Sequence, residues 1–139
     1  KFAKLYKIPF RVLNLNHIIT LESFLNDLQK RNISIICLAG YMKILNKQFI
    51  SKFNKKIINI HPSLLPKYKG LNTFKRTLKD KEQLTGCTVH YVNNKLDSGM
   101  TILKKKVYIQ PNDNEKTLKA KVQAKEYRAY SESVFNIFR

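Results

Sequence analysis

Three side chains able to support acyl-group transfer lie at the ends of strand-like segments. Asn59 lies in the β-branched run 56–60, and His61 follows it at the start of a proline-rich loop. Open α/β sheets keep their ligand sites at strand ends. Asp97 lies in the sequence LDSG at 96–99, between two further strand-like segments. An amide can donate to a developing oxyanion, an imidazole can move a proton near neutral pH, and a carboxylate favours the protonated imidazole. The pattern predicts acyl-type transfer without a covalent intermediate.

Each residue also has an ordinary structural interpretation. The end of a strand explains Asn59, a lone histidine at that place can simply satisfy its hydrogen bonds, and Asp97 beside Gly99 is typical of a turn. For the aspartate both interpretations can hold together, because a turn can fix the carboxylate that the chemistry uses. His90 alternates with hydrophobic residues and is interpreted as structural. The chain has no HxxxH pattern and no Cys/His cluster of ligand spacing, so we expect no metal site.

Five segments match one known family of enzymes. They are LAGYMKIL at 38–45, NIHPSLLPKYKG at 59–70, GCTVHYV at 86–92, LDSG at 96–99 and VQAKE at 122–126. With these segments the chain resembles the glycinamide ribonucleotide formyltransferases of purine synthesis. Several folate-dependent formyltransferases and hydrolases share HPSLLP, but its combination with LAGYMKIL and KYKG is specific to the purine branch. The resemblance implies transfer of a formyl group from 10-formyltetrahydrofolate to the amine of glycinamide ribonucleotide, without a metal.

The resemblance also implies a role for each site residue. His61 would move the proton, Asp97 would pair with it and organise a proton-relaying water, and Asn59 would donate to the formyl oxygen. The folate-binding residues would be Met42, Lys43, Ile44, Leu45, Val92, Asn93 and Asn94, acting largely through backbone groups. The residues contacting the nucleotide substrate would be Pro62, Gln123 and Glu126. As the alternative, Gln123 and Glu126 form a solvated pair on one helix face.

The pteridine slot implied by the resemblance is lined by apolar side chains. These are Leu38, Met42, Ile44, Leu45, Phe49, Ile57 and Val92. The alternative that the residues themselves favour is that this set belongs to the hydrophobic core.

Strand-like and helical segments alternate along the chain, which predicts an α/β fold with a Rossmann-like, mostly parallel sheet flanked by helices. The expected strands are 8–15, 33–39, 57–60, 85–92 and 101–109, and the last two can pair antiparallel. The run 33–39 is nearly continuously apolar, which is typical of a strand buried on both faces. The expected N-caps of the helices are Thr20, Asn46, Thr73 and Asp113.

The family binds its nucleotide phosphate with a glycine-rich loop after its first strand. None of the four glycines of this chain, Gly40, Gly70, Gly86 and Gly99, lies in such a loop. We therefore expect residues 1–139 to form a single formyltransferase domain that lacks the N-terminal phosphate-binding βαβ part, as a truncated piece of a longer enzyme. That would leave an open strand edge beside 33–39.

Composition limits the class of partner. The formal net charge is +18, with 27 Lys and Arg against nine Asp and Glu. The lysines are dispersed through every segment, whereas a nucleic-acid binder usually concentrates them on one stripe. We expect anionic small molecules as partners, namely glycinamide ribonucleotide and the reduced folate, and no specific nucleic acid.

Location and assembly follow from the remaining features. No apolar run is long enough to cross a bilayer, and two lone cysteines, Cys37 and Cys87, indicate free thiols in a reducing cytoplasm. We expect a cytoplasmic monomer or homodimer. The rival interpretations are another folate-dependent formyltransferase, a formyltetrahydrofolate hydrolase, or an inactive basic fragment that binds nucleic acid nonspecifically.

Overall fold

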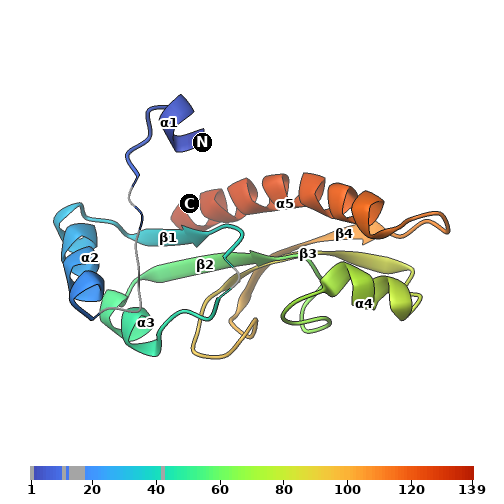
Figure 1. Cartoon of the computed structure of the whole chain (residues 1–139), viewed down its shortest axis with the longest axis horizontal. Helices are drawn as coiled ribbons and strands as arrows, with labels where there is room; N and C mark the ends of the chain where they lie inside the picture. Colours follow the sequence, from blue (N-terminus) through green and yellow to red (C-terminus); the bar gives the residue numbers. More distant parts are fainter. Residues whose placement is uncertain (1, 11, 13–17, 42) are drawn as a thin grey trace.

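The computed structural model describes residues 2–10, 12, 18–41 and 43–139 (Figure 1). The described strands form one sheet in the order β1-β2-β3-β4. The elements along the chain are α1 (Phe2–Leu5), α2 (Ile18–Lys30), β1 (Ile35–Leu38), α3 (Lys47–Phe53), β2 (Lys56–His61), α4 (Thr73–Lys79), β3 (Leu84–Tyr91), β4 (Thr101–Tyr108) and α5 (Glu115–Phe138).

The α/β class with flanking helices is confirmed, but the sheet is mixed, so the expectation of a mostly parallel sheet is corrected. β1 and β2 are parallel, whereas β2–β3 and β3–β4 are antiparallel. A parallel β3 would require the chain to return to the far end of β2. The connection 62–83, which contains α4, does not return there. β3 starts beyond the end of β2, and His61 pairs with Thr88.

The two faces of the sheet are covered by different helices. Ile58 belongs to a core cluster shared with Leu118 and Val122 of α5, and α5 runs along the length of the sheet (Figure 1). Ile57, one residue earlier and so on the other face, belongs to a second cluster with residues of α2 and α3. Asn59 and His61 share that second face, because they follow Ile57 at intervals of two.

β1 differs from the expected strand 33–39. It covers only Ile35–Leu38, lies at one end of the described sheet, and has an exposed Cys37. The expectation of burial on both faces is therefore wrong, because an edge strand packs against fewer neighbours. Of the expected strand 8–15, Ile8 to Phe10 and Val12 are not in a strand, and the other residues lie outside the described part of the chain.

The helix starts test the expected N-caps. The side chain of Asn46 accepts a hydrogen bond from the Gln48 backbone at 2.7 Å and caps α3 as predicted. Thr73 is the first residue of α4 and not its cap, and α2 begins before Thr20. The cap of α5 is Asn114, whose side chain and that of Thr117 form a capping box.

Asp113, the expected cap of α5, lies one residue before the true cap. It accepts hydrogen bonds from Thr117 Oγ1 at 2.9 Å and from Lys121 Nζ at 2.7 Å. These contacts, led by that of Lys121, lower the pKa of Asp113 to about 2. Its carboxylate therefore stabilises the first turns of α5 from outside the helix.

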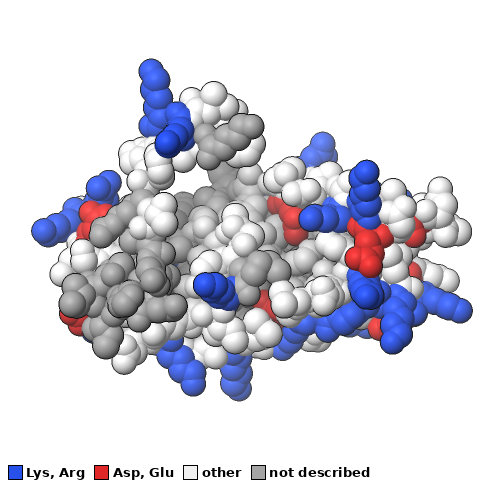
Figure 2. All heavy atoms as spheres, in the orientation of Figure 1, with Lys and Arg blue, Asp and Glu red and all other residues white. Residues whose placement is uncertain are grey.

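Three further findings concern the surface, the thiols and the helices. Figure 2 shows Lys and Arg side chains spread over several parts of the displayed face, with fewer acidic residues among them. Cys37 and Cys87 are both free. None of the described helices has the length and apolar character that crossing a membrane requires.

Candidate active site

The end of β2 presents Asn59 and His61 on one face of the sheet. Asn59 is partly buried, and His61 is only 6% exposed. In the antiparallel register with β3, Asn59 pairs with His90, and directly opposed residues point to the same face. The structure thus places an amide and two imidazoles next to one another.

Asp97 reaches this face from the turn that joins β3 to β4. The turn closes tightly, because the Tyr91 backbone N–H donates to the Met100 carbonyl at 2.9 Å and a Cβ at Gly99 would overlap the Tyr91 carbonyl. A register shift at Val89/His90 marks an irregularity in the ladder just before the turn, and such irregularities re-aim side chains next to active sites. Asp97 itself has a φ of +43°.

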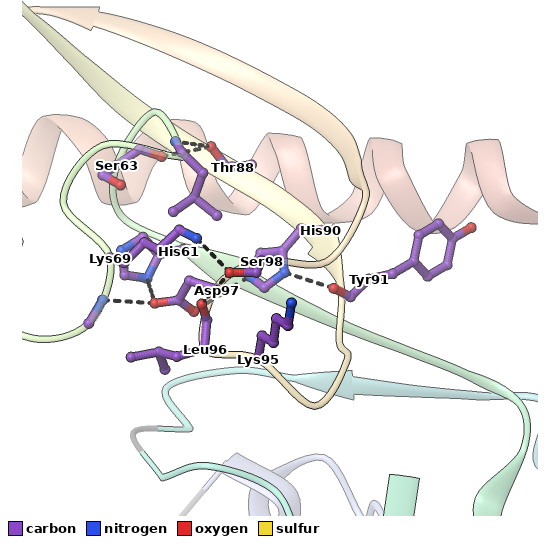
Figure 3. Close-up of polar contacts among 12 residues, drawn as sticks. His61, Ser63, Lys69, Thr88, His90, Tyr91, Lys95, Leu96, Asp97 and Ser98 are labelled. Carbon is purple, nitrogen blue, oxygen red and sulfur yellow. Dashed lines mark hydrogen bonds and ion pairs between the residues drawn. The ribbon is translucent and has the colours of Figure 1, made fainter. Parts of the chain in front are cut away.

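His61 lies between two acceptors, of which Figure 3 shows the Asp97 carboxylate. Its Nδ1 is 3.3 Å from Asp97 Oδ2, and its Nε2 is 2.8 Å from the Tyr68 carbonyl oxygen. A carbonyl oxygen only accepts, so Nε2 donates the bond to Tyr68, while Nδ1 lies at ion-pair distance from the carboxylate. The Asp97 side chain is 8% exposed, so water screens this pair weakly. The geometry places a buried carboxylate beside the imidazole of His61.

The loop after His61 closes over this pair and is anchored at several points. The Gly70 backbone N–H donates to Asp97 Oδ2 at 2.8 Å. Tyr68 donates its hydroxyl proton towards Asp80 and Glu82, and the Arg76 guanidinium lies over its ring at 5.5 Å. These contacts fix the carbonyl of Tyr68 that faces His61.

His90, which the sequence interpretation took as structural, lies beside this cluster, opposite Asn59 and close to Asp97. It is 2% exposed, and its Nδ1 donates to the Tyr91 carbonyl at 2.9 Å. Its Nε2 is 3.8 Å from Asp97 Oδ1 and has no hydrogen-bond partner among the described residues. Burial lowers the pKa of His90, against the opposing effect of Asp97. Only the antiparallel pairing with Asn59 would have revealed this position.

The chemistry available to this cluster is proton transfer beside a hydrogen-bond donor. A buried imidazole paired with a carboxylate can give and take a proton, and the amide of Asn59 on the same face can donate to an oxyanion. Within the described residues no group of three His, Cys, Asp or Glu side chains is arranged to hold a metal ion.

Comparison with known proteins identifies the family to which the chain belongs. The family described as Formyl transferase matches residues 4–134, nearly the whole chain. The chain belongs to the formyl transferase family. Among its relatives, the phosphoribosylglycinamide formyltransferase of Haemophilus influenzae is 42% identical over 132 residues, covering 92% of this chain and 62% of that protein. The human trifunctional purine biosynthetic protein adenosine-3 is 39% identical, covering 88% of this chain and 13% of that protein.

Solved structures of formyl transferases have the same fold. The phosphoribosylglycinamide formyltransferase of Coxiella burnetii matches with a TM-score of 0.84 at 40% identity, covering 99% of this chain and 68% of that one. The enzyme of Anaplasma phagocytophilum matches with a TM-score of 0.86 at 37% identity, covering 95% and 64%. The chain therefore spans about two thirds of these formyl transferase chains.

The residues expected to hold the folate of a formyl transferase are spread over different environments. Leu45 is 5% exposed and lies in the core cluster of α2 and α3, as do Phe49 and Ile57, so the core interpretation describes them. Ile44 is 68% exposed. Lys43, Asn93 and Asn94 are exposed, Val92 is partly buried, and Met42 lies outside the described residues.

The residues expected to contact the nucleotide are divided between two parts of the molecule. Pro62 is partly buried directly after His61. Gln123 is exposed and Glu126 partly buried on α5, which packs against the opposite face of the sheet. Burial raises the pKa of Glu126, with Lys119 opposing. The structure brings Asn59, His61, Pro62 and Asp97 together, and leaves Gln123 and Glu126 on the far side of the sheet.

Proposed function

We propose that the protein to which this chain belongs transfers a formyl group from 10-formyltetrahydrofolate to the amine of glycinamide ribonucleotide. The observation that carries the proposal is the buried contact of His61 with Asp97 beside Asn59, in a member of the formyl transferase family. The identity of 42% to a phosphoribosylglycinamide formyltransferase supports the choice of substrates.

The proposed reaction begins with attack of the substrate amine on the formyl carbon. The carbonyl π-bond opens to an oxyanion, which accepts a hydrogen bond from the Asn59 amide. The oxyanion then re-forms the carbonyl π-bond as the C–N bond to the folate breaks, and His61, protonated and paired with Asp97, gives a proton to the leaving folate nitrogen. The proton released by the attacking amine returns to the His61–Asp97 pair. The products are the formamide and tetrahydrofolate, and neither a metal nor a covalent enzyme adduct takes part.

The binding of the two substrates is proposed in the same way. The reduced folate would contact the backbone around Lys43 to Leu45 and Asn93 to Asn94, and the nucleotide would contact Pro62, Gln123 and Glu126. Residues 1–139 would act as a single domain in the cytoplasm, with the phosphate bound by a part of the protein outside this chain. Because α5 covers the opposite face of the sheet from His61, a nucleotide that contacts both would pass the end of the sheet.

The test is an assay of formyl transfer with 10-formyltetrahydrofolate and glycinamide ribonucleotide, on the chain and on its longer parent. We compare the wild type with Asn59→Ala and His61→Ala, and use Asn136→Ala, an exposed position on α5, as the matched control. Loss of one oxyanion donor is expected to raise the barrier by about 2–4 kcal/mol.

Three results would contradict the proposal. Equal activity of Asn59→Ala and Asn136→Ala would show that Asn59 does not take part in the reaction. Release of formate from 10-formyltetrahydrofolate at the same rate with and without the amine acceptor would indicate a hydrolase. Salt-dependent RNA binding with no folate binding would favour the inactive basic fragment.

A further inference from the structure

A lysine joins the two loops that carry the His61–Asp97 pair. Lys69 Nζ donates to Ser98 Oγ at 2.5 Å, and Ser98 Oγ donates onward to the Leu96 carbonyl at 2.8 Å. Ser98 and Leu96 are the two neighbours of Asp97 in the turn, so the contact holds the turn on both sides of the carboxylate. Figure 3 shows Lys69 and Ser98 beside His61, Asp97 and His90.

Lys69 is itself held in place. Its backbone carbonyl accepts a hydrogen bond from the Arg76 guanidinium at 2.6 Å, and the residue is partly buried, while its bond to Ser98 lies at the surface. The next residue, Gly70, donates its backbone N–H to Asp97 Oδ2 at 2.8 Å. Two consecutive residues of one loop therefore hold the turn: Lys69 through its side chain and Ser98, and Gly70 through its backbone N–H and the Asp97 carboxylate.

The turn needs such support because of its backbone conformation. Asp97 has a φ of +43°, in the left-handed region that residues other than glycine enter at a cost. Such residues keep this conformation only where surrounding contacts over-determine it. Without the contacts from Lys69 and Gly70, the turn would gain freedom to move the carboxylate away from His61.

We propose that Lys69 is a positioning residue, which holds the Asp97 turn closed over His61 through its bond to Ser98. The kinetic consequence rests on the formyl transfer proposed above, but the structural consequence does not. Lys69 acts through Asp97 and is not assigned contact with the reacting atoms.

Lys69 also acts electrostatically on His90, as the smallest of several influences. The charged and titratable groups that affect His90 are Asp97, which raises its pKa, and His61 and Lys69, which lower it in addition to burial. Removing the Lys69 charge removes one of the causes that lower the pKa of His90.

Lys67 provides the matched control. It is in the same loop, but its side chain is 65% exposed and pairs with Glu82 at 2.6 Å, not with the Asp97 turn. Lys67→Met and Lys69→Met each remove one positive charge from the loop, so they have the same effect on net charge. Only the second breaks the contact with Ser98.

The first experiment uses NMR on the 139-residue chain and needs no turnover. In Lys69→Met and in Ser98→Ala we expect hydrogen exchange of the Gly70 amide to accelerate about tenfold, because its acceptor on Asp97 becomes mobile. In Lys69→Met alone we also expect the pKa of His90 to rise. Lys67→Met should leave both unchanged. Gly70 exchange and a His90 pKa in Lys69→Met equal to those in Lys67→Met would overturn the proposal.

The second experiment measures formyl transfer by the parent enzyme. We expect Lys69→Met to lower kcat roughly tenfold with little change in KM, because misplacement of a catalytic group slows the chemical step. The double variant Lys69→Met/Ser98→Ala should be no slower than the slower single variant, since both break one contact. If the two substitutions instead lower kcat by factors that multiply in the double variant, the proposal is contradicted. A wild type without any formyl transfer would refute the proposed function, while the NMR result would still decide the role of Lys69.

Discussion

Substitution of Asp97 by asparagine tests the proposed proton-transfer pair most directly. The variant keeps the size of the side chain and an oxygen that can accept from the Gly70 N–H, but it removes the negative charge beside His61. At the observed 3.3 Å between Nδ1 and Oδ2, the interaction of two unit charges is about 5 kcal/mol at an effective dielectric constant near 20. Desolvation offsets part of this, and breaking a buried pair typically costs about 3–5 kcal/mol.

If about 3–4 kcal/mol of that energy supports the protonated His61 in the transition state, kcat/KM falls roughly 10²- to 10³-fold. The assay is steady-state formyl transfer, with the folded state checked by circular dichroism. Asp113→Asn is the control, because Asp113 is a carboxylate bound to Lys121 at the start of α5 and away from the site. A decrease of kcat/KM in Asp97→Asn that is within about fivefold of the control (about 1 kcal/mol) would refute the electrostatic reasoning.

Three further changes test the surroundings of the site. Gly99→Ala places a methyl group onto the Tyr91 carbonyl and is expected to lower the free energy of unfolding by about 1–3 kcal/mol, measured by urea denaturation; an unchanged midpoint would contradict the tight turn. His90 has a pKa lowered below 6.5 in the folded protein, so the unfolded chain binds more protons below that pH. The free energy of unfolding therefore falls as pH drops below 6.5, by up to about 1.4 kcal/mol per pH unit. His90→Gln should show a shallower fall. Equal dependence of the unfolding free energy on pH in the two proteins, measured by urea denaturation, would contradict this. Asn114→Ala removes the cap of α5 and is expected to lower the free energy of unfolding by about 1 kcal/mol, whereas Asn112→Ala, before the cap, should not.

Local features of the sequence predicted the elements that local forces determine. Asn46 was predicted as a cap because its side chain bonds within its own turn. The sequence predicted Asp113 as the cap of α5, whereas the cap is Asn114. The two adjacent side chains are similar, and the sequence does not show which residue adopts the extended backbone that a cap needs. Burial of β1 was overestimated because an apolar run does not show how many strands lie beside it.

The candidate site was partly predictable for the same physical reason. Asn59, His61 and Asp97 stand at a strand end and in a turn, which are visible in the sequence. Their contacts with Gly70 and Tyr68 depend on how the loop after His61 folds back. Their relation to His90 depends on strand register, and register is set by pairing between segments about thirty residues apart, which no local pattern reveals.

The antiparallel direction of β3, which the sequence did not predict, explains the position of His90. Because β3 runs back along β2, its residues beyond Thr88 pass beside Asn59, and the strand ends at Tyr91, opposite Ile58. The turn that follows then has to fold back over the same face to begin β4, and Gly99 lets it lie against the Tyr91 carbonyl. A parallel β3 would run in the same direction as β2, and the turn after it would lie beyond His61. Reversal of one strand thus places an imidazole and a carboxylate from distant parts of the chain next to the amide and imidazole of β2.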